Sequence, residues 1–171
     1  MAVLEILKYP HPILQKKTEP VSRIDDTIRQ LVQSMAETMY AAPGVGLAAP
    51  QVGIPLRLAV LDVTKANEPK DLLVLINPEI VASEGECSWE EGCLSIPDCN
   101  EEVKRLKKVS VRFQNLEGRE NTVTAEDLLS IALQHEIDHL DGILFIDRLS
   151  RIKRDFLKRK LRKQKNEDVK S

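Results

Sequence analysis

Apolar residues recur at the spacing of an α-helix near both ends of the chain. From about Asp26 to Ala42 they share one face, and the pattern ends at Pro43-Gly44; the face holds Ile28, Leu31, Val32, Met35 and Met39. The two methionines there are typical core-filling residues. A second helix is predicted from about Ser150 to Lys165, with Ile152, Phe156, Leu157 and Leu161 along one side.

A third helix is predicted between these two. Thr124 followed three residues later by Asp127 matches a capping box and marks its start, and Asp141-Gly142 marks its end. Its first half is apolar on most sides, through Leu128, Leu129, Ile131, Ala132 and Leu133. We therefore expect this helix to be buried.

Shorter apolar runs predict strands. Leu56 to Val63 is one, Leu72 to Ile76 is a second that Asn77-Pro78 closes, and Ile80 to Ala82 begins a third. Pro43 to Pro55, before the first of them, is rich in Gly and Pro and is expected to be a loop.

The clearest strand pattern lies between Val103 and Thr124. Val109, Val111 and Phe113 alternate with polar residues, which indicates a half-buried strand. Asn115 to Gly118 is a hairpin turn, and Asn121 to Thr124 is the returning strand. Antiparallel or mixed strands around a central buried helix, with a helix near each end of the chain, favour an α+β fold.

Length and composition narrow the picture further. We expect one domain over residues 1–150 and a basic helical tail over residues 151–171, in a chain that is 42% hydrophobic. No run of about 20 apolar residues exists, so we expect no membrane span, and the first ten residues do not resemble a signal peptide. Three cysteines are too few for a disulfide scaffold. A reducing compartment, the cytoplasm, is therefore expected.

The net charge of −2 conceals an uneven distribution. From Arg148 to Ser171 there are eleven basic and three acidic residues, a local charge of +8, whereas residues 1–147 carry −10. A basic helix of this kind suits a phosphate-rich surface such as the ribosome, without sequence-specific binding of nucleic acid. A solvated terminal helix with no partner is the alternative, and the composition leaves both open.

The buried helix carries the sequence His135-Glu136-Ile137-Asp138-His139. Residues four apart leave an α-helix on one face, one turn apart, so His135 and His139 can bind one divalent metal ion. Glu136 lies about 100° round the helix from His135, where it can take a proton from a water molecule that the metal activates.

A catalytic metal site of this type needs a third protein ligand. The longer pattern H-x-x-G-x-x-H continues as far as Gly142, but Phe145 occupies the place of the last histidine. A downstream acid such as Asp147 or Asp155 is one alternative. Cys93 is the better candidate, because a thiolate is a strong metal ligand and its neighbour Gly92 allows close backbone approach.

A third unusual stretch is Gly44-Val45-Gly46-Leu47-Ala48-Ala49-Pro50-Gln51. Its small residues give a backbone against which a substrate can lie, and Gln51 offers an amide donor for a developing oxyanion. Together with Glu91-Gly92-Cys93-Leu94-Ser95 and Gln134 to Gly142, it completes three motifs in order, GxGLAAxQ, EGCLS and QHExDHLxG. In these motifs the chain resembles the peptide deformylases.

The resemblance implies a role for each motif residue. Cys93, His135 and His139 would bind one divalent metal, Fe²⁺ in the cell with Zn²⁺, Ni²⁺ or Co²⁺ possible after purification. Glu136 would be the general base and acid, and Gln51 and the backbone N–H of Leu94 would stabilise the oxyanion. An ion pair between Glu91 and Arg105 would support the metal loop. At two positions the sequence departs from the family pattern. It has Asn100 where the family often has a bulky or basic residue, and Leu106 where many relatives have Pro.

The implied substrate is the N-terminal formylmethionine of a newly made polypeptide. The Gly46 backbone would pair with this peptide. An apolar pocket for the methionine side chain would draw on Val45, Trp89, Leu128, Ile131 and Ala132.

Two other functions are compatible with the same residues. One is a zinc endopeptidase that uses the histidine pair with a different third ligand. The other is a ribosome- or RNA-binding module in which the metal is structural, although such a site needs a fourth protein ligand and the sequence marks none.

Overall fold

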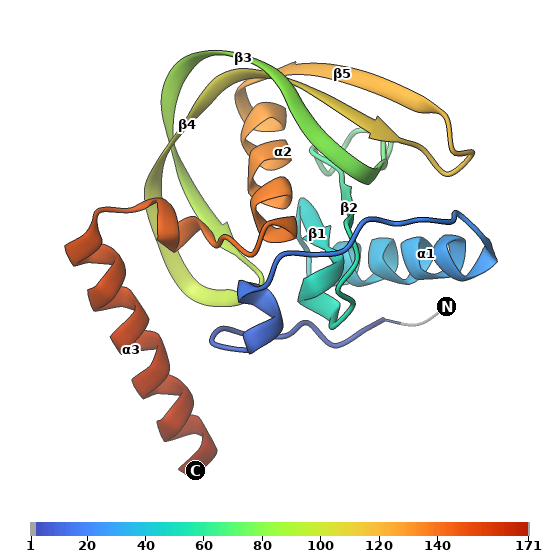
Figure 1. Cartoon of the computed structure of the whole chain (residues 1–171). Coiled ribbons are helices and arrows are strands. Elements are labelled where there is room, and N and C mark those ends of the chain that lie inside the picture. Colours follow the sequence, from blue (N-terminus) through green and yellow to red (C-terminus); the bar gives the residue numbers. More distant parts are fainter. Residues whose placement is uncertain (1–2, 171) are drawn as a thin grey trace.

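The computed structural model describes residues 3–170, with side chains for residues 3–165. Within this range it has three α-helices and a five-stranded sheet, which confirms the α+β prediction (Figure 1). The predicted tail extends beyond the described residues at Ser171, and the side chains from Asn166 onward lie outside them as well.

The sheet is antiparallel throughout, with its strands in chain order. The strands are β1 (Gly46–Ala48), β2 (Leu58–Leu61), β3 (Leu73–Cys93), β4 (Ile96–Gln114) and β5 (Glu120–Glu126). The two longest strands, β3 and β4, form a hairpin that arches over the helix α2 (Asp127–Leu140) in Figure 1. The hairpin turns at Leu94-Ser95, because Cys93 pairs with Ile96.

The prediction that Asn77-Pro78 ends a strand and that Ile80 begins another is wrong. One strand runs through both positions, and its register against β4 shifts between Ile76 and Glu79. Asn77 has a φ of 53°, in the left-handed region that asparagine tolerates, so the extra backbone is absorbed as a bulge. The strand predicted over Leu56 to Val63 is shorter than expected, Leu58–Leu61.

The predicted capping box at the start of α2 is also wrong. Thr124 lies in β5, opposite Ser110, and the two hydroxyl oxygens are 2.8 Å apart. Because β5 stays paired with β4 as far as Glu126, the helix begins later, at Asp127. The predicted hairpin turn is present, and Gly118 N–H donates to the Asn115 carbonyl at 2.9 Å.

The core explains why β2 is apolar on both faces. Leu58 and Val60 pack with residues of the helix α1 (Asp26–Ala41), whereas Leu61 packs with residues of α2. All four residues of β2 are fully or almost fully buried, as are Met35 and Met39 of α1. Strand β2 therefore lies between the two helices, and α2 in turn lies between β2 and the β3–β4 hairpin.

Asp62, directly after β2, fixes the loop that precedes the sheet. Its backbone N–H donates to the Val45 carbonyl at 2.8 Å, and its carboxylate accepts hydrogen bonds from Tyr40 Oη, from Thr64 and from the Asp71 backbone. Burial would raise the pKa of Asp62, but these hydrogen bonds outweigh it and lower that pKa to about 2. The carboxylate therefore stays ionised and holds α1, β2 and the Val45 loop together.

The basic tail forms the helix α3 (Arg151–Lys170), which leaves the rest of the molecule at the lower left of Figure 1. Only part of its predicted apolar side packs: Leu157 is buried and Leu161 is partly buried, but Ile152 and Phe156 are 86% and 62% exposed. Three short 3₁₀ helices complete the fold: η1 (Pro12–Gln15), η2 (Ala49–Val52) and η3 (Phe145–Arg148). Among residues 3–170, none of the helices has both the length and the apolar character that crossing a bilayer requires.

Candidate metal centre and active site

Helix α2 places His135 and His139 on one face, as their spacing predicts. Their Nε2 atoms are 3.1 Å apart, and their rings meet edge to face with centroids 4.8 Å apart. His139 is almost completely buried, whereas the His135 side chain is 13% exposed. Two imidazole nitrogens this close are typical of histidines that share a metal ion.

Cys93 supplies the third donor, from the last residue of β3. Its Sγ lies 3.3 Å from His139 Nε2, and the donor atoms of Cys93, His135 and His139 all lie within 4.8 Å of one another. One thiolate and two imidazoles suit a divalent transition metal, and three protein ligands leave a coordination position open. The group therefore has the composition of a catalytic metal site.

The alternative third ligands are engaged elsewhere. Asp147 accepts a hydrogen bond from the Leu144 N–H and pairs with Lys158 at 2.7 Å, and Asp155 pairs with Arg154. Neither belongs to the metal-ligand group that the described residues form. The other two cysteines, Cys87 and Cys99, are free thiols outside that group.

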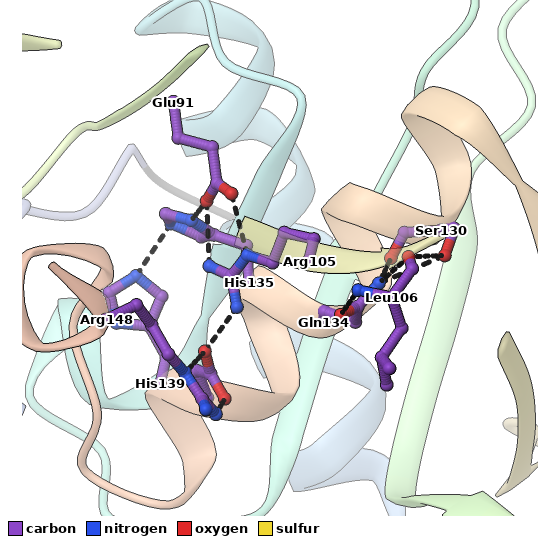
Figure 2. A network of polar contacts seen from close by, with 9 residues as sticks. Glu91, Arg105, Leu106, Ser130, Gln134, His135, His139 and Arg148 are labelled. Atoms are coloured by element: carbon purple, nitrogen blue, oxygen red, sulfur yellow. Dashed lines mark hydrogen bonds and ion pairs between the residues drawn. The ribbon is translucent and has the colours of Figure 1, made fainter. Parts of the chain in front are cut away.

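Glu91 and Arg105 form a buried ion pair with two parallel hydrogen bonds. Arg105 Nε and Nη2 donate to the two Glu91 oxygens at 2.7 and 2.8 Å. Glu91 Oε1 also lies 3.0 Å from His135 Nδ1, so the carboxylate orients the histidine ring (Figure 2). Burial would raise the pKa of Glu91, but the hydrogen bonds from Arg105 and His135 outweigh it and hold that pKa below its usual value.

Sequence reasoning missed two members of this network, Asp138 and Arg148. Arg105 Nη1 donates to Asp138 Oδ2 at 2.6 Å, and Arg148 donates to both Asp138 oxygens at 2.7 and 3.1 Å. A signal for Asp138 was present, because a charged residue on a buried helix requires a partner. Arg148 carried no such signal, since it follows the helix and precedes a run of basic residues that begins at Arg151.

A second polar cluster ties α2 to β4 one turn earlier (Figure 2). Gln134 Oε1 accepts the Leu106 N–H at 2.9 Å, and its Nε2 donates to the Leu106 carbonyl at 2.7 Å and to Ser130. A proline at position 106 has no N–H to donate. Leu106 therefore makes a backbone hydrogen bond to Gln134 that a proline at this position could not make.

Gln51 lies in the 3₁₀ helix η2 with its amide aimed at the metal ligands. Its Oε1 accepts the Ala48 N–H at 2.9 Å, which directs Nε2 toward Ser95 Oγ at 3.1 Å and Cys93 Sγ at 3.7 Å. Ser95 is a further residue that sequence reasoning did not single out, although it belongs to the EGCLS motif. The side-chain carbonyl of Gln51 is thus anchored and its N–H₂ group faces the site.

The N-terminal segment forms hydrogen bonds with the two chain segments around Gln51 and Leu94. Leu7 N–H donates to the Gln51 carbonyl at 2.7 Å, and Tyr9 N–H donates to the Ser95 carbonyl at 2.9 Å. Lys8 Nζ donates to the Leu94 carbonyl at 2.9 Å. Three consecutive residues therefore hold both chain segments that carry potential oxyanion donors.

Glu136 lies beside the metal ligands and is 3% exposed. Its Oε2 and His139 Nδ1 are buried polar atoms without a hydrogen-bond partner among the described side chains. Burial raises the pKa of the Glu136 carboxyl to about 7, although the nearby His135 lowers it in part. A Cβ atom at Gly46 would lie 2.8 Å from Glu136 Cδ and Oε1, so only glycine fits opposite this carboxylate.

A cavity of about 370 Å³ opens over these groups. Its lining includes the predicted residues Val45, Gly46, Gln51, Cys93, Leu94, Leu128, Ile131, Ala132, His135 and Glu136. Trp89 is not part of that lining; it lies farther along β3, pairs with Val103 and is 38% exposed. Asn100 Oδ1 lies so close to Gly92, a residue of that lining, that a Cβ atom at Gly92 would clash with it.

These features define a metal-dependent hydrolase: a helix that carries two histidines and a glutamate, a third ligand from a strand, and an open cavity beside them. Comparison with known families gives the same class. Residues 3–155 match the polypeptide deformylase family, and the chain belongs to that family.

Individual relatives match over almost the whole chain. A peptide deformylase of Acidobacterium capsulatum is 53% identical over 95% of this chain and 96% of its own. The crystal structure of a peptide deformylase from Legionella pneumophila has a TM-score of 0.89 and 44% identity, covering 99% of each chain. The peptide deformylase from Ehrlichia chaffeensis in complex with actinonin has a TM-score of 0.89 and 38% identity, covering 96% of this chain and 98% of its own.

The Glu91→Gln variant tests whether this carboxylate supports the metal site. The substitution removes the charge that pairs with Arg105 and faces His135, and the loss of such an outer partner weakens metal binding by roughly 10- to 100-fold. Competition for Zn²⁺ against a chromophoric chelator measures the change. Glu102→Gln, at an exposed position of the same hairpin, is the matched control, and equal affinities for both variants would contradict the assignment.

Proposed function

We propose that the chain removes the formyl group from the N-terminal formylmethionine of newly made polypeptides and releases formate. The observation that carries this proposal is the open Cys93, His135 and His139 group beside the buried Glu136, in a cavity with apolar walls. Membership of the polypeptide deformylase family supports the same reaction. We assign catalysis to residues 1–150 and a separate role to the basic tail.

Cys93, His135 and His139 would hold one divalent cation. When bound, it would polarise the formyl carbonyl and make a water molecule acidic near neutral pH. Glu136 takes the proton from the attacking water, because its carboxylate is buried beside the ligands and its Oε2 has no hydrogen-bond partner among the described residues. It then returns the proton to the departing amine nitrogen, since an amine cannot leave as an anion.

Two N–H donors stabilise the negative charge that develops on the formyl oxygen. One is Gln51 Nε2, which its Oε1 contact with Ala48 directs toward the site. The other is the backbone N–H of Leu94, in the two-residue turn next to Cys93. Both are fixed before the reaction, so little reorganisation accompanies the transition state.

The substrate lies along the free edge of β1. This strand lies at one edge of the sheet, and among the described residues it pairs with β2 alone. The Gly46 backbone is therefore available to an extended peptide. The methionine side chain enters the apolar part of the cavity, against Val45, Leu128, Ile131 and Ala132. Trp89 is not part of this lining, and we assign it no contact with methionine.

The Glu136→Gln variant tests the reaction. It keeps the size of the side chain but cannot accept the proton, and we expect formate release from a formyl-Met peptide to fall by roughly 10²- to 10⁴-fold. Metal content, measured in parallel, stays near that of the unmodified protein. The acetyl-Met peptide is the substrate control. Retained formate release in this variant would exclude Glu136 as the general base, whereas no formate release from the unmodified protein would exclude the hydrolase reaction and favour a structural metal.

We propose Fe²⁺ as the metal in the cell, with Zn²⁺, Ni²⁺ or Co²⁺ able to replace it during purification. One thiolate and two imidazoles suit each of these ions. Protein purified without oxygen is expected to carry mostly iron and to lose activity in air. Elemental analysis and activity before and after exposure measure this. Stoichiometric zinc with full activity in air would contradict it.

We propose that the chain works in the cytoplasm and that α3 docks on the ribosome. Cys93 must remain a free thiolate to bind metal, which a reducing compartment ensures. Arg159, Arg162 and Lys163 are exposed on α3, on the part of the helix beyond the buried Leu157. Their charges suit a phosphate-rich surface.

Reversal of these three charges to Glu tests the docking. The triple variant is expected to lose co-sedimentation with ribosomes at low salt, whereas Lys16→Glu with Lys17→Glu, also exposed, leaves it unchanged. Equal co-sedimentation of both variants would show that the tail has no such role.

A further inference from the structure

Arg148 links the surface of the molecule to the buried ion pair behind the metal site. It is the last residue of η3, two residues separate it from α3, and its side chain is 46% exposed. Its guanidinium binds Asp138 through two hydrogen bonds, Nη2 to Oδ1 at 2.7 Å and Nε to Oδ2 at 3.1 Å. Figure 2 shows this side chain reaching the network from the side opposite Glu91.

The hydrogen bonds continue from Asp138 toward the metal site. Asp138 Oδ2 also accepts from Arg105 Nη1, and the two remaining donor groups of Arg105 hold both oxygens of Glu91. Glu91 Oε1 lies 3.0 Å from Nδ1 of His135. Five residues therefore form one chain of charge-assisted hydrogen bonds that ends on a metal ligand.

The charges in this chain balance only when Arg148 is included. Asp138 and Glu91 are two buried carboxylates, and Arg105 between them carries one positive charge. Without Arg148, one guanidinium serves both carboxylates, and a buried charge without full compensation is costly. The least costly response is for Arg105 to shift toward Asp138, which weakens its hold on Glu91.

We propose that Arg148 is a positioning residue for His135. By neutralising Asp138, it leaves the Nε and Nη2 groups of Arg105 to Glu91, and Glu91 then fixes the orientation of the imidazole ring. The inference rests on the ligand set of the proposed function. It adds a residue outside the three motifs, contributed by the segment that joins the catalytic body to the basic tail.

The test measures the affinity of the full chain for Zn²⁺ by competition with a chromophoric chelator. Arg148→Met is expected to weaken binding by about threefold to tenfold, less than a direct partner of a ligand, whose loss costs roughly 10- to 100-fold. Arg148→Lys restores part of the affinity, because lysine supplies the charge but not the paired donors. Lys104→Met is the matched control: Lys104 lines the same cavity as Asp138 and Arg148 and is exposed. It is expected to leave affinity unchanged.

A second substitution separates charge balance from packing. Asp138→Asn added to Arg148→Met removes the carboxylate that Arg148 neutralises, so affinity should return to within about twofold of the unmodified protein. A packing role for the Arg148 side chain predicts no recovery. The absorption spectrum of the Co²⁺ protein reports the ligand geometry of each variant independently of catalysis.

Two results would overturn the inference: unchanged affinity in Arg148→Met, or a loss that Asp138→Asn does not recover. Cys93→Ala distinguishes this failure from failure of the proposed function. If Cys93→Ala retains full affinity, the ligand set itself is wrong. If it loses affinity while Arg148→Met does not, the ligand set stands and only the role of Arg148 is excluded.

Discussion

The arrangement of the whole molecule depends on keeping ionised groups stable inside it. Helix α2 is buried between β2 and the β3–β4 hairpin, yet it carries Asp138 among its buried residues. Water cannot solvate this carboxylate, so protein groups must do so. Arg105 is the principal one: it is 5% exposed and joins Glu91 on β3 to Asp138 on α2. One guanidinium and its partners thus stabilise both the packing of the hairpin on the helix and the alignment of the metal ligands.

The β3–β4 hairpin also determines much of the geometry of the site. Cys93 and Leu94 lie at its turn, Glu91 lies two residues before Cys93 on β3, and Arg105 lies on β4 opposite Cys87. A metal ligand, a backbone donor and the ion pair behind them are therefore carried by a single local element, whose formation closes only a short loop. Helix α2 supplies the remaining ligands at fixed helical spacing. Only the relative placement of these two rigid elements must be set by the tertiary fold.

The sequence predicted the parts of the site that depend on local periodicity. The spacing of His135 and His139 determines their common face, and the structure has both nitrogens 3.1 Å apart. What could not be predicted depends on tertiary neighbours. Thr124 has the sequence of a helix cap but bonds Ser110 across the sheet, and Asn77-Pro78 has the sequence of a strand end but forms a bulge within β3. Trp89 lies on the same strand as Cys93, yet it is not part of the cavity lining. Arg148 acts through Asp138, a contact that only the folded chain creates.

The free edge of β1 has a consequence for the breadth of the proposed reaction. A strand edge binds a peptide through main-chain hydrogen bonds, which are the same for every residue except proline. In the proposed binding mode the apolar cavity would contact only the first side chain, and residues further along the peptide would be held by a pattern that carries no information about their identity. Such a site would be selective for how a chain begins and permissive about how it continues. That combination would suit an enzyme whose substrates share only their first residue.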